Sequence, residues 1–338
     1  MKNKVLAAIA ALFLFVAATD QRAVPVKLDV PAGWPQPTYD FANNPLTKEG
    51  IALGRKLFYD PILSTDSIVS CSSCHLSYTA FTHVDHAVSH GVGDSIGTRN
   101  SLALMNLAWS KSFMWDGAVN HLDMQALAPI SHPDEMGEDF KHVIQKLQRS
   151  ERYPELFRSA FGDDSITGER MLKALSQFEL TLISANSKYD RVMHKTEAFT
   201  EQEANGYALF NANCSACHKE PLFTTDEFAN NGLPIDTVFN DLGRMLITND
   251  PADSLKFKIP TLRNIEFSFP YMHDGRFKSL RNVLDHYAEG IQHSATLAPE
   301  LQKGISLSKN ERTDIVAFLL TLSDREFCFN PNFAYPRE

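Results

Sequence analysis

Cys71-Ser72-Ser73-Cys74-His75 has a second copy later in the chain, Cys214-Ser215-Ala216-Cys217-His218. Two thiols at this spacing can form thioethers to the two vinyl groups of one porphyrin, and the adjacent histidine then lies under the iron as its proximal ligand. The repeated motif therefore predicts two covalently bound c-type haems. The predicted attachment residues are Cys71, Cys74, Cys214 and Cys217, and the predicted iron ligands are His75 and His218.

A four-cysteine zinc site is the alternative, because two Cys-x-x-Cys pairs can supply its thiolates. However, the two pairs lie far apart in the sequence, and a histidine follows each pair directly. A chance Cys-x-x-Cys-His is uncommon and two in one chain are rarer, so haem attachment is the favoured interpretation. The fifth cysteine, Cys328, has no partner left and is interpreted as a partly buried thiol.

The N-terminus has the features of an export signal. Lys2 and Lys4 precede an apolar run from Val5 to Ala18, and small residues end it. This pattern predicts a signal peptide over residues 1–18. The run is too short to span a bilayer comfortably and no second apolar stretch follows, so stable membrane insertion is not expected. The predicted location is the periplasm, since c-type haems are attached outside the cytoplasm.

The composition is that of a globular protein: 338 residues with 43% hydrophobic content, enough for two domains of ordinary size. The formal net charge is −9 at pH 7. An acidic chain does not suit nucleic acid as a partner. A small electron-transfer protein with a basic face suits it better, with charge acting mainly on the association rate.

The sequence around each haem motif is also repeated, with spacings that vary as loop insertions would make them. The matched segments are Gly54-Arg55-Lys56-Leu57-Phe58 with Gly206-Tyr207-Ala208-Leu209-Phe210, Arg99-Asn100 with Arg263-Asn264, Met114-Trp115-Asp116-Gly117 with Met272-His273-Asp274-Gly275, and Phe178–Leu182 with Phe318–Leu322. The repeat predicts two homologous haem domains, over residues 19–190 and 191–338.

Helix signals stand around both motifs. Thr200 with Glu203 forms a capping box that opens a helix leading into the second motif, and Ser308 with Glu311 opens another. Apolar residues at helical spacing fill residues 168–184. A helix before the motif and a helix closing the domain resemble the cytochrome c fold. The predicted fold class is mostly α, with two cytochrome c-like haem domains related by internal duplication.

The two halves differ at positions close to the predicted irons. When the Asp-Gly landmarks are aligned, Trp115 matches His273 and Pro129 matches Tyr287. Proline has no side-chain ligand, whereas tyrosine has a phenol. We therefore expect an open iron at the first haem and a sixth ligand at the second.

The chain resembles the bacterial di-haem cytochrome c peroxidases, including their MauG branch, over residues 45–323. The motifs that carry the resemblance are Phe113-Met114-Trp115-Asp116-Gly117, Gln125, Pro133-Asp134-Glu135-Met136-Gly137, Pro260-Thr261-Leu262-Arg263-Asn264 and Pro270-Tyr271-Met272-His273-Asp274-Gly275. The resemblance implies that Trp115 lies between the haems, that Glu135 moves the proton of peroxide, and that Gln125 holds peroxide or water.

The resemblance also implies a calcium ion between the haem domains. Asn100 matches the side-chain ligand, and Ser268 and Pro270 match positions that give backbone carbonyls; oxygen donors suit calcium. Many members carry a removable distal histidine, for which His90 is the candidate here, although the loop reads more like the MauG type and a solvated His90 is favoured. A homodimer is implied by the resemblance alone.

Tyr287 departs from the typical peroxidases, which ligate the second haem with His and Met. Its position looks like the His/Tyr haem of the MauG branch, and a phenolate ligand would lower the reduction potential relative to Met. The open alternative is that Tyr287 packs in a helix while His286 or Met272 takes the iron.

Three functions follow from these observations. The first is a periplasmic di-haem cytochrome c peroxidase that reduces hydrogen peroxide to water with electrons from a small cytochrome c or cupredoxin. The second is a MauG-like oxidase that acts on a protein or organic substrate by long-range electron transfer. The third, a non-catalytic di-haem electron carrier, requires no open iron and gives Glu135 and Gln125 no role.

Overall fold

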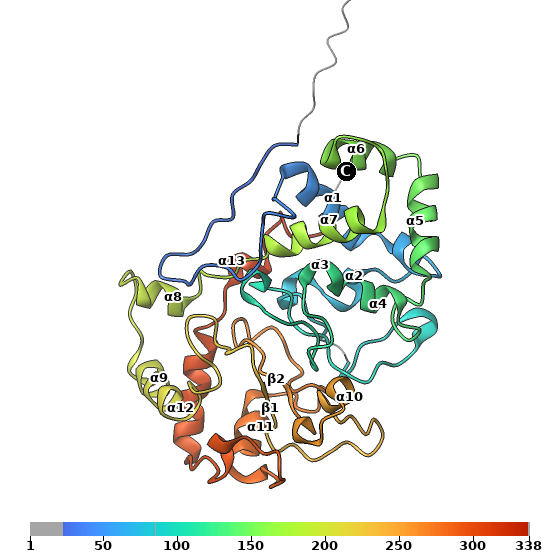
Figure 1. Cartoon of the computed structure of the whole chain (residues 1–338). Coiled ribbons are helices and arrows are strands. Elements are labelled where there is room, and N and C mark those ends of the chain that lie inside the picture. The colour runs from blue at the N-terminus through green and yellow to red at the C-terminus, as the bar shows by residue number, and fades with distance from the viewer. Residues whose placement is uncertain (1–22, 85, 337–338) are drawn as a thin grey trace, which may run out of the picture.

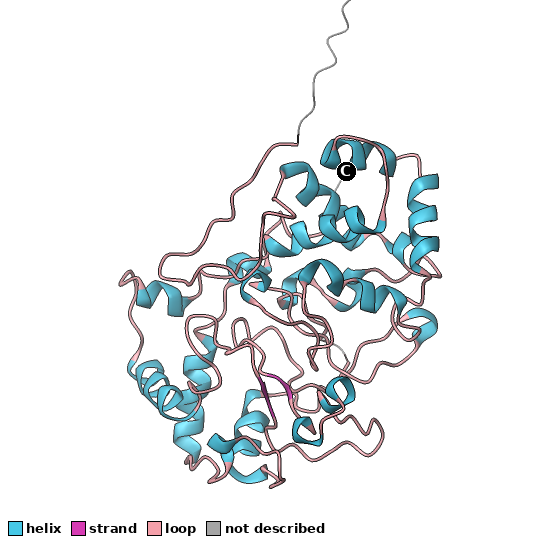
Figure 2. Ribbon diagram, viewed as in Figure 1, coloured by secondary structure: helices cyan, strands magenta, loops and turns pink. Residues whose placement is uncertain are grey.

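The computed structural model describes residues 23–84 and 86–336, and the predicted signal peptide lies outside them. The described chain is mostly helical, as Figure 2 shows. Its paired strands, β1 (Phe228–Ala229) and β2 (Phe257–Lys258), are two residues long and antiparallel. The predicted mostly-α class is confirmed. No helix of the described part is both long enough and apolar enough to cross a membrane.

The helices fall into two groups that follow each other along the chain (Figure 1). The first group is α1 (Lys48–Tyr59), α2 (Cys71–Cys74), α3 (Leu122–Gln125), α4 (Leu127–Ser131), α5 (Phe140–Arg149), α6 (Tyr153–Phe161) and α7 (Gly168–Leu180). After α8 (Lys188–Met193) come α9 (Glu201–Asn213), α10 (Met245–Thr248), α11 (Leu280–Asp285), α12 (Lys309–Leu320) and α13 (Arg325–Cys328). Short 3-10 turns connect them, including η4 (Leu107–Trp109), and a π-helix covers His286–Gly290.

Both predicted capping boxes are present. The Thr200 hydroxyl accepts from the Glu203 N–H at 3.3 Å, and the Glu203 carboxylate accepts from the Thr200 N–H at 2.7 Å. Ser308 and Glu311 repeat this exchange at the start of α12. Each box satisfies backbone donors that the first helical turn leaves without partners, so α9 and α12 begin where the sequence predicts.

In each half, the two long helices cross at a glycine. A Cβ added to Gly54 of α1 would lie 1.8 Å from the carbonyl oxygen of Ala174 in α7. A Cβ added to Gly206 of α9 would lie 1.9 Å from the carbonyl oxygen of Asp314 in α12. The repeated glycine is therefore a packing requirement, because a backbone cannot yield by such a distance.

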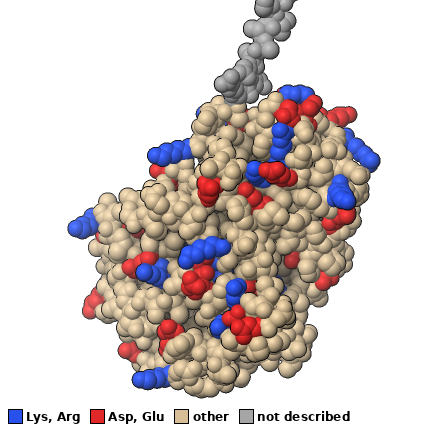
Figure 3. All heavy atoms as spheres, viewed as in Figure 1, with Lys and Arg blue, Asp and Glu red and all other residues tan. Residues whose placement is uncertain are grey.

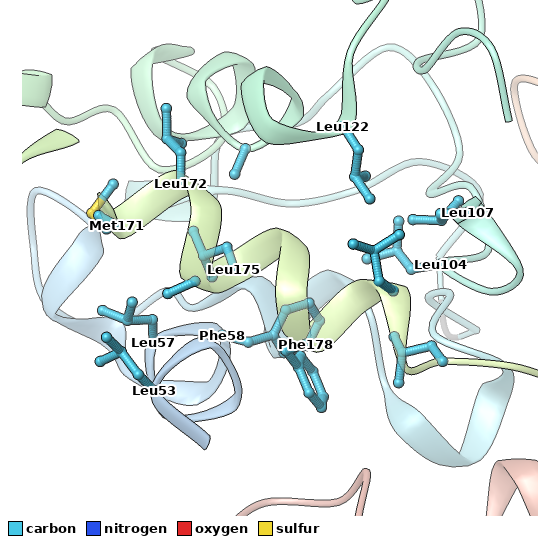
Figure 4. Packing of buried hydrophobic residues seen from close by; sticks show 14 of the residues in the cluster. Leu53, Leu57, Phe58, Leu104, Leu107, Leu122, Met171, Leu172, Leu175 and Phe178 are labelled. Carbon is cyan, nitrogen blue, oxygen red and sulfur yellow. The ribbon is translucent and has the colours of Figure 1, made fainter. Parts of the chain in front are cut away.

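The repeated phenylalanines lie beside these crossings. The Phe58 and Phe178 rings are 5.3 Å apart, and the Phe210 and Phe318 rings are 5.0 Å apart. Each pair belongs to its own apolar core, so each half has a core of its own. Figure 4 shows how the first core forms, with side chains of α1, α3 and α7 meeting: Leu53, Leu57, Phe58, Leu122, Leu175 and Phe178.

The two Met-x-Asp-Gly segments form the same turn. Met114 and Met272 both have positive φ, at 68° and 76°. The N–H of Gly117 donates to the Met114 carbonyl at 3.3 Å, and the N–H of Gly275 donates to the Met272 carbonyl at 3.2 Å. The residue between methionine and aspartate therefore occupies the same position in both halves, which supports the alignment of Trp115 with His273.

The repeat continues upstream, but through a different asparagine from the one predicted. Asn106 and Asn264 are both buried with φ near 58° and 57°. Their N–H groups donate to the carbonyls of Leu182 and Leu322 at 2.8 and 3.0 Å. Asparagine tolerates this left-handed backbone, which explains its presence at both sites. The predicted match of Arg99-Asn100 with Arg263-Asn264 is therefore wrong; Asn106 is the counterpart of Asn264.

The C-terminal segment returns to the first half. The Arg55 guanidinium donates to the Ala334 carbonyl at 2.9 Å, and the Tyr59 hydroxyl donates to the Phe333 carbonyl at 2.6 Å. Cys328 is 1% exposed within the first core, more deeply buried than predicted. Residues 325–335, predicted as part of the C-terminal domain, thus complete the core of the N-terminal one (Figure 1).

A half-buried arginine ties the two halves together. Arg99 donates to both oxygens of Asp241 at 2.6 and 2.9 Å and to Asp116 at 2.6 Å. The Asn100 N–H donates to the His273 carbonyl at 2.7 Å. A guanidinium held by two carboxylates is a directional, charge-assisted contact, so the halves have a defined relative position here.

We expect Gly206→Ala to lower the free energy of unfolding by about 1–3 kcal/mol, because its methyl group meets the α12 backbone. Asn205→Ala, on the exposed face of the same helix, is the matched control and should leave stability nearly unchanged. Chemical denaturation of the haem-loaded protein measures both. Equal unfolding midpoints for the two variants would show that the crossing is not close-packed.

Asp241→Asn should lower the free energy of unfolding at neutral pH by about 1.5–3 kcal/mol, the contribution of hydrogen bonds to a charged group. Burial opposes ionisation of Asp241, but Arg99 outweighs burial and lowers the pKa of this carboxyl. A lowered pKa contributes stability above the unfolded-state pKa, and that stability is lost as pH falls through the folded-state pKa. The difference from wild type should therefore shrink in acid. Glu227→Gln, in an exposed pair with Lys111, should change little at any pH.

Candidate haem sites

A cavity of about 910 Å³ runs between the halves and is lined by side chains from both motifs. Almost all predicted site residues line it: Cys74, His75, Asn100, Trp115, Gln125, Glu135, Cys214, Cys217, His218, Ser268, Pro270 and Tyr287. Cys71 lies beside it, half-buried against the first core. The structure thus gathers residues that are far apart in the sequence around one volume.

Both motifs fold into the same tight turn. Cys71–Cys74 is a single turn, α2, and the His75 N–H donates to the Cys71 carbonyl at 3.0 Å. The His218 N–H donates to the Cys214 carbonyl at 2.9 Å. The turn therefore places two thiols and one imidazole close together, as attachment of one porphyrin requires.

The hydrogen bonds and burial of His75 and His218 suit both side chains to bind a metal. His75 Nδ1 lies 2.7 Å from the Phe81 carbonyl oxygen, and His218 Nδ1 lies 3.2 Å from the Phe223 carbonyl oxygen. Each Nδ1 therefore carries the proton, and Nε2 keeps its lone pair. Burial lowers the pKa of both imidazoles to about 4, so they are neutral at physiological pH. This donor set, together with the thiols and the cavity, fits two haems.

Trp115 lies where the halves meet and is 8% exposed. Its indole N–H donates to the Asn100 carbonyl at 2.8 Å, and its own carbonyl accepts from the Lys258 N–H at 2.7 Å. Its ring lies 6.5 Å from that of His273, which stacks on Phe257 at 3.6 Å. Contacts from both halves hold the indole in one orientation within the cavity wall.

Glu135 and Gln125 lie on the first-motif side of the cavity. Glu135 is half-buried. Burial is the main cause that raises the pKa of the Cys74 thiol, and Glu135 is close enough for its charge to raise this pKa further. Burial raises the pKa of Glu135, Asp134 adds to the effect, and His132 opposes it. The Gln125 amide lies 3.8 Å from the Met114 sulfur. Glu135 therefore lies near the first motif, and Gln125 lines the same cavity beside Met114.

Tyr287 lies on the second-motif side, within the π-helix. Burial raises the pKa of its phenol to about 12, and both Cys214 and Cys217 add to this effect. The neighbouring His286 is bonded elsewhere, with Nε2 3.0 Å from the Asn231 carbonyl oxygen. π-helical turns are frequent at functional sites because they rotate a side chain out of helical register. Pro129, its counterpart in the repeat, also lines the cavity.

Sequence reasoning missed two residues of this site, Asn231 and His132. The Asn231 amide donates to the Met272 sulfur at 3.5 Å and hydrogen-bonds the Tyr287 phenol. His132 lines the cavity and its carbonyl accepts from the Glu135 N–H at 3.1 Å. The Asn-Asn-Gly sequence at 230–232 marks a turn, but its position against Tyr287 depends on the tertiary fold.

His90 lies outside the cavity lining. Its Nδ1 is 2.8 Å from the Asp94 carboxylate, and its ring stacks on that of His86 at 4.4 Å. These contacts support the favoured prediction of a loop histidine.

The predicted calcium residues all line the cavity. Asn100 donates its amide N–H to the Ala87 carbonyl at 2.9 Å, which leaves its amide oxygen as an acceptor. Ser268 and Pro270 line the same cavity. The described residues contain no group of three or more His, Cys, Asp or Glu side chains arranged for a metal, so a calcium site would use amide and carbonyl oxygens.

Comparison with known proteins agrees with this geometry. Residues 48–198 match the family described as di-haem cytochrome c peroxidase, and residues 203–323 match cytochrome c. The chain is 39% identical to the methylamine utilization protein MauG of Methylorubrum extorquens, over 82% of this chain and 79% of that protein. It is 32% identical to the cytochrome c551 peroxidase of Nitrosomonas europaea, over 84% and 81%.

A solved structure extends the comparison to the fold. The crystal structure of a MauG-like protein associated with microbial copper homeostasis superimposes with a TM-score of 0.85 and 31% identity, covering 92% of this chain and 99% of that one. Two haem motifs in one cavity, two cytochrome c-like halves and these relatives lead to one conclusion. The chain is an enzyme of the di-haem cytochrome c peroxidase family, which includes the MauG proteins.

Proposed function

We propose that the protein reduces hydrogen peroxide to water at the first haem, in the periplasm, with electrons from a small cytochrome c or cupredoxin. One observation carries the proposal: equivalent positions of the two halves face one cavity, with Pro129 at the first site and Tyr287 at the second. A haem held by His75 would then have no side-chain ligand on its other face, whereas one held by His218 would have Tyr287 available as a second ligand.

The first site supplies the groups that peroxide cleavage needs. When bound there, the haem supplies the two-electron reduction of peroxide. Glu135 takes a proton from the near oxygen of peroxide and returns it to the far oxygen. Gln125 orients peroxide by hydrogen bonds. Two electrons and two protons in total convert one peroxide into two waters.

The second site supplies electrons. His218 and Tyr287 would hold the second haem iron, and Trp115 would provide an aromatic bridge to the first site. The Asn100 carbonyl that fixes the indole belongs to the proposed calcium ligand, so the ion would stabilise the bridge. The donor would meet an acidic protein, although the face in Figure 3 carries both signs of charge interspersed. Export by residues 1–18 and a homodimer belong to the same proposal.

A MauG-like oxidase is the second candidate, and Tyr287 favours it. A phenolate ligand stabilises oxidised iron, so the second site would be a poor acceptor of electrons from a high-potential donor. It would instead hold an oxidising equivalent and take electrons from a protein or organic substrate. The first site and Glu135 have the same roles in both candidates.

Glu135→Gln should reduce steady-state peroxide-dependent oxidation of ferrocytochrome c by about 100-fold or more, because the proton acceptor is lost. The ionised carboxylate is the active form and burial raises its pKa, so wild-type activity should rise with pH through that raised pKa. Glu135→Gln should lack this rise. Asp134→Asn, an exposed neighbour, should keep turnover and move the rise to lower pH, because it removes a negative charge beside Glu135.

The same assay separates the candidates. Rapid cytochrome turnover that disappears in Glu135→Gln supports the peroxidase. A long-lived oxidised protein with little cytochrome turnover supports the oxidase. No reaction with peroxide in any redox state contradicts both.

Tyr287→Phe should change the absorption and electron paramagnetic resonance spectra of one haem and raise its reduction potential, because an anionic ligand is lost. Tyr271→Phe is the matched control, since Tyr271 also lines the cavity but its hydroxyl donates to the Ile265 carbonyl at 2.9 Å. An unchanged second haem in Tyr287→Phe would rule out tyrosine ligation and leave Met272 as the candidate in the cavity wall.

A further inference from the structure

Glu179 is a carboxyl group inside the first core. It lies on α7 between Phe178 and Leu180 and is 4% exposed. Among the described residues, no side chain or backbone group hydrogen-bonds or ion-pairs with its carboxyl oxygens. Placing a carboxyl group in an apolar core costs stability, so packing alone does not explain a glutamate here.

The other half shows what packing alone would select. Phe178 and Phe318 occupy equivalent positions, each with its Cβ about 3 Å from the Cβ that the crossing glycine lacks. The residue after Phe318 is Leu319, which is 5% exposed in the second core. The same buried position therefore holds a leucine in the half with the second haem and a carboxyl in the half with the first.

The surroundings of Glu179 connect it to the first haem site. Its charge raises the pKa of the Cys71 thiol, an attachment residue, after burial as the main cause. The α3 turn that packs against α7 carries Gln125 and Asp123. Asp123 accepts from the Tyr39 hydroxyl at 2.7 Å and lies 3.9 Å from His121 at the surface.

Few charges face this carboxyl from neighbouring elements. Asp123 of α3 is the charged group that acts on the pKa of Glu179, and Glu179 in turn acts on Cys71 of α2. The η4 turn is apolar, and the other neighbouring elements carry further titratable groups: Lys48, Glu49, Arg55, Lys56 and Tyr59 on α1, and Lys141, His142, Lys146 and Arg149 on α5. Burial, with Asp123 as a second cause, raises the pKa of Glu179 to about 8. The group can therefore change protonation near physiological pH.

We propose that Glu179 couples proton uptake to reduction of the first haem. When one electron from the donor enters the first haem site, the Glu179 carboxylate binds one proton, and both leave on oxidation. An added negative charge nearby favours the neutral carboxyl, and burial strengthens this interaction. Glu179 acts on the first haem through its charge and does not touch substrate. The proposal rests on the haem at Cys71–His75 and not on peroxide as substrate.

Redox potentiometry of the haem-loaded protein across pH tests the proposal without peroxide. In wild type, the potential of the first haem should fall as pH rises above about 8, because Glu179 is then ionised in the oxidised protein and each electron brings a proton to it. The potential should level off above the higher pKa of the reduced protein, where the electron no longer brings a proton. Glu179→Gln and Glu179→Leu should both lose this dependence, and the leucine variant reproduces a side chain that the second half packs at this position. Glu169→Gln, an exposed glutamate of α7 paired with Lys173, should keep it.

Infrared difference spectra between oxidised and reduced protein give a second readout. A carboxylic acid band that grows on reduction in wild type and is absent from both Glu179 variants supports the proposal. An unchanged dependence of the first potential on pH in the variants, or a carboxyl band that persists in them, overturns it. The potential of the second haem should follow the same curve in all four proteins.

Discussion

The close crossing of two helices at a glycine is the constraint on which each half depends. At Gly54 and at Gly206 the partner backbone occupies the space of a side chain, so the two long helices of each half can meet in one way. The phenylalanines beside the crossing then fill the core, and the turn with the haem motif follows the first helix of the pair. Because both halves meet this constraint, equivalent positions in them can be compared residue by residue.

That comparison separates two kinds of difference. Pro129 and Tyr287 face the cavity, where one half offers no side-chain ligand and the other offers a phenol. Glu179 and Leu319 lie inside the cores, where one half buries a carboxyl group and the other an apolar side chain. The two halves share the helix crossing and the turn with the haem motif, and they differ in side chains at a few equivalent positions. Arg99 then holds these unequal halves at a fixed separation, with Trp115 between them.

Much of this arrangement was predictable from the sequence, because local chemistry dictates it. The haem motifs, the capping boxes at Thr200 and Ser308 and the Met-x-Asp-Gly turns all depend on residues within a few positions of each other. The match of Asn100 with Asn264 failed because a short motif does not reveal backbone conformation. Asn106 and Asn264 share a left-handed φ, and this identifies them as counterparts only once the structure is known. Asn231 was missed because its partners, Met272 and Tyr287, come from distant segments.

The return of the C-terminal segment has a consequence for how the chain folds. Residues 325–335 complete the first core, and Cys328 lies within it. The first core therefore joins segments that are 279 residues apart in the sequence, as the hydrogen bond from Arg55 to Ala334 shows. Contacts between such distant segments carry a large loop-closure entropy cost and slow folding. The first core thus depends on long-range contacts with this segment, whereas the second core, over the described residues, includes none of its side chains.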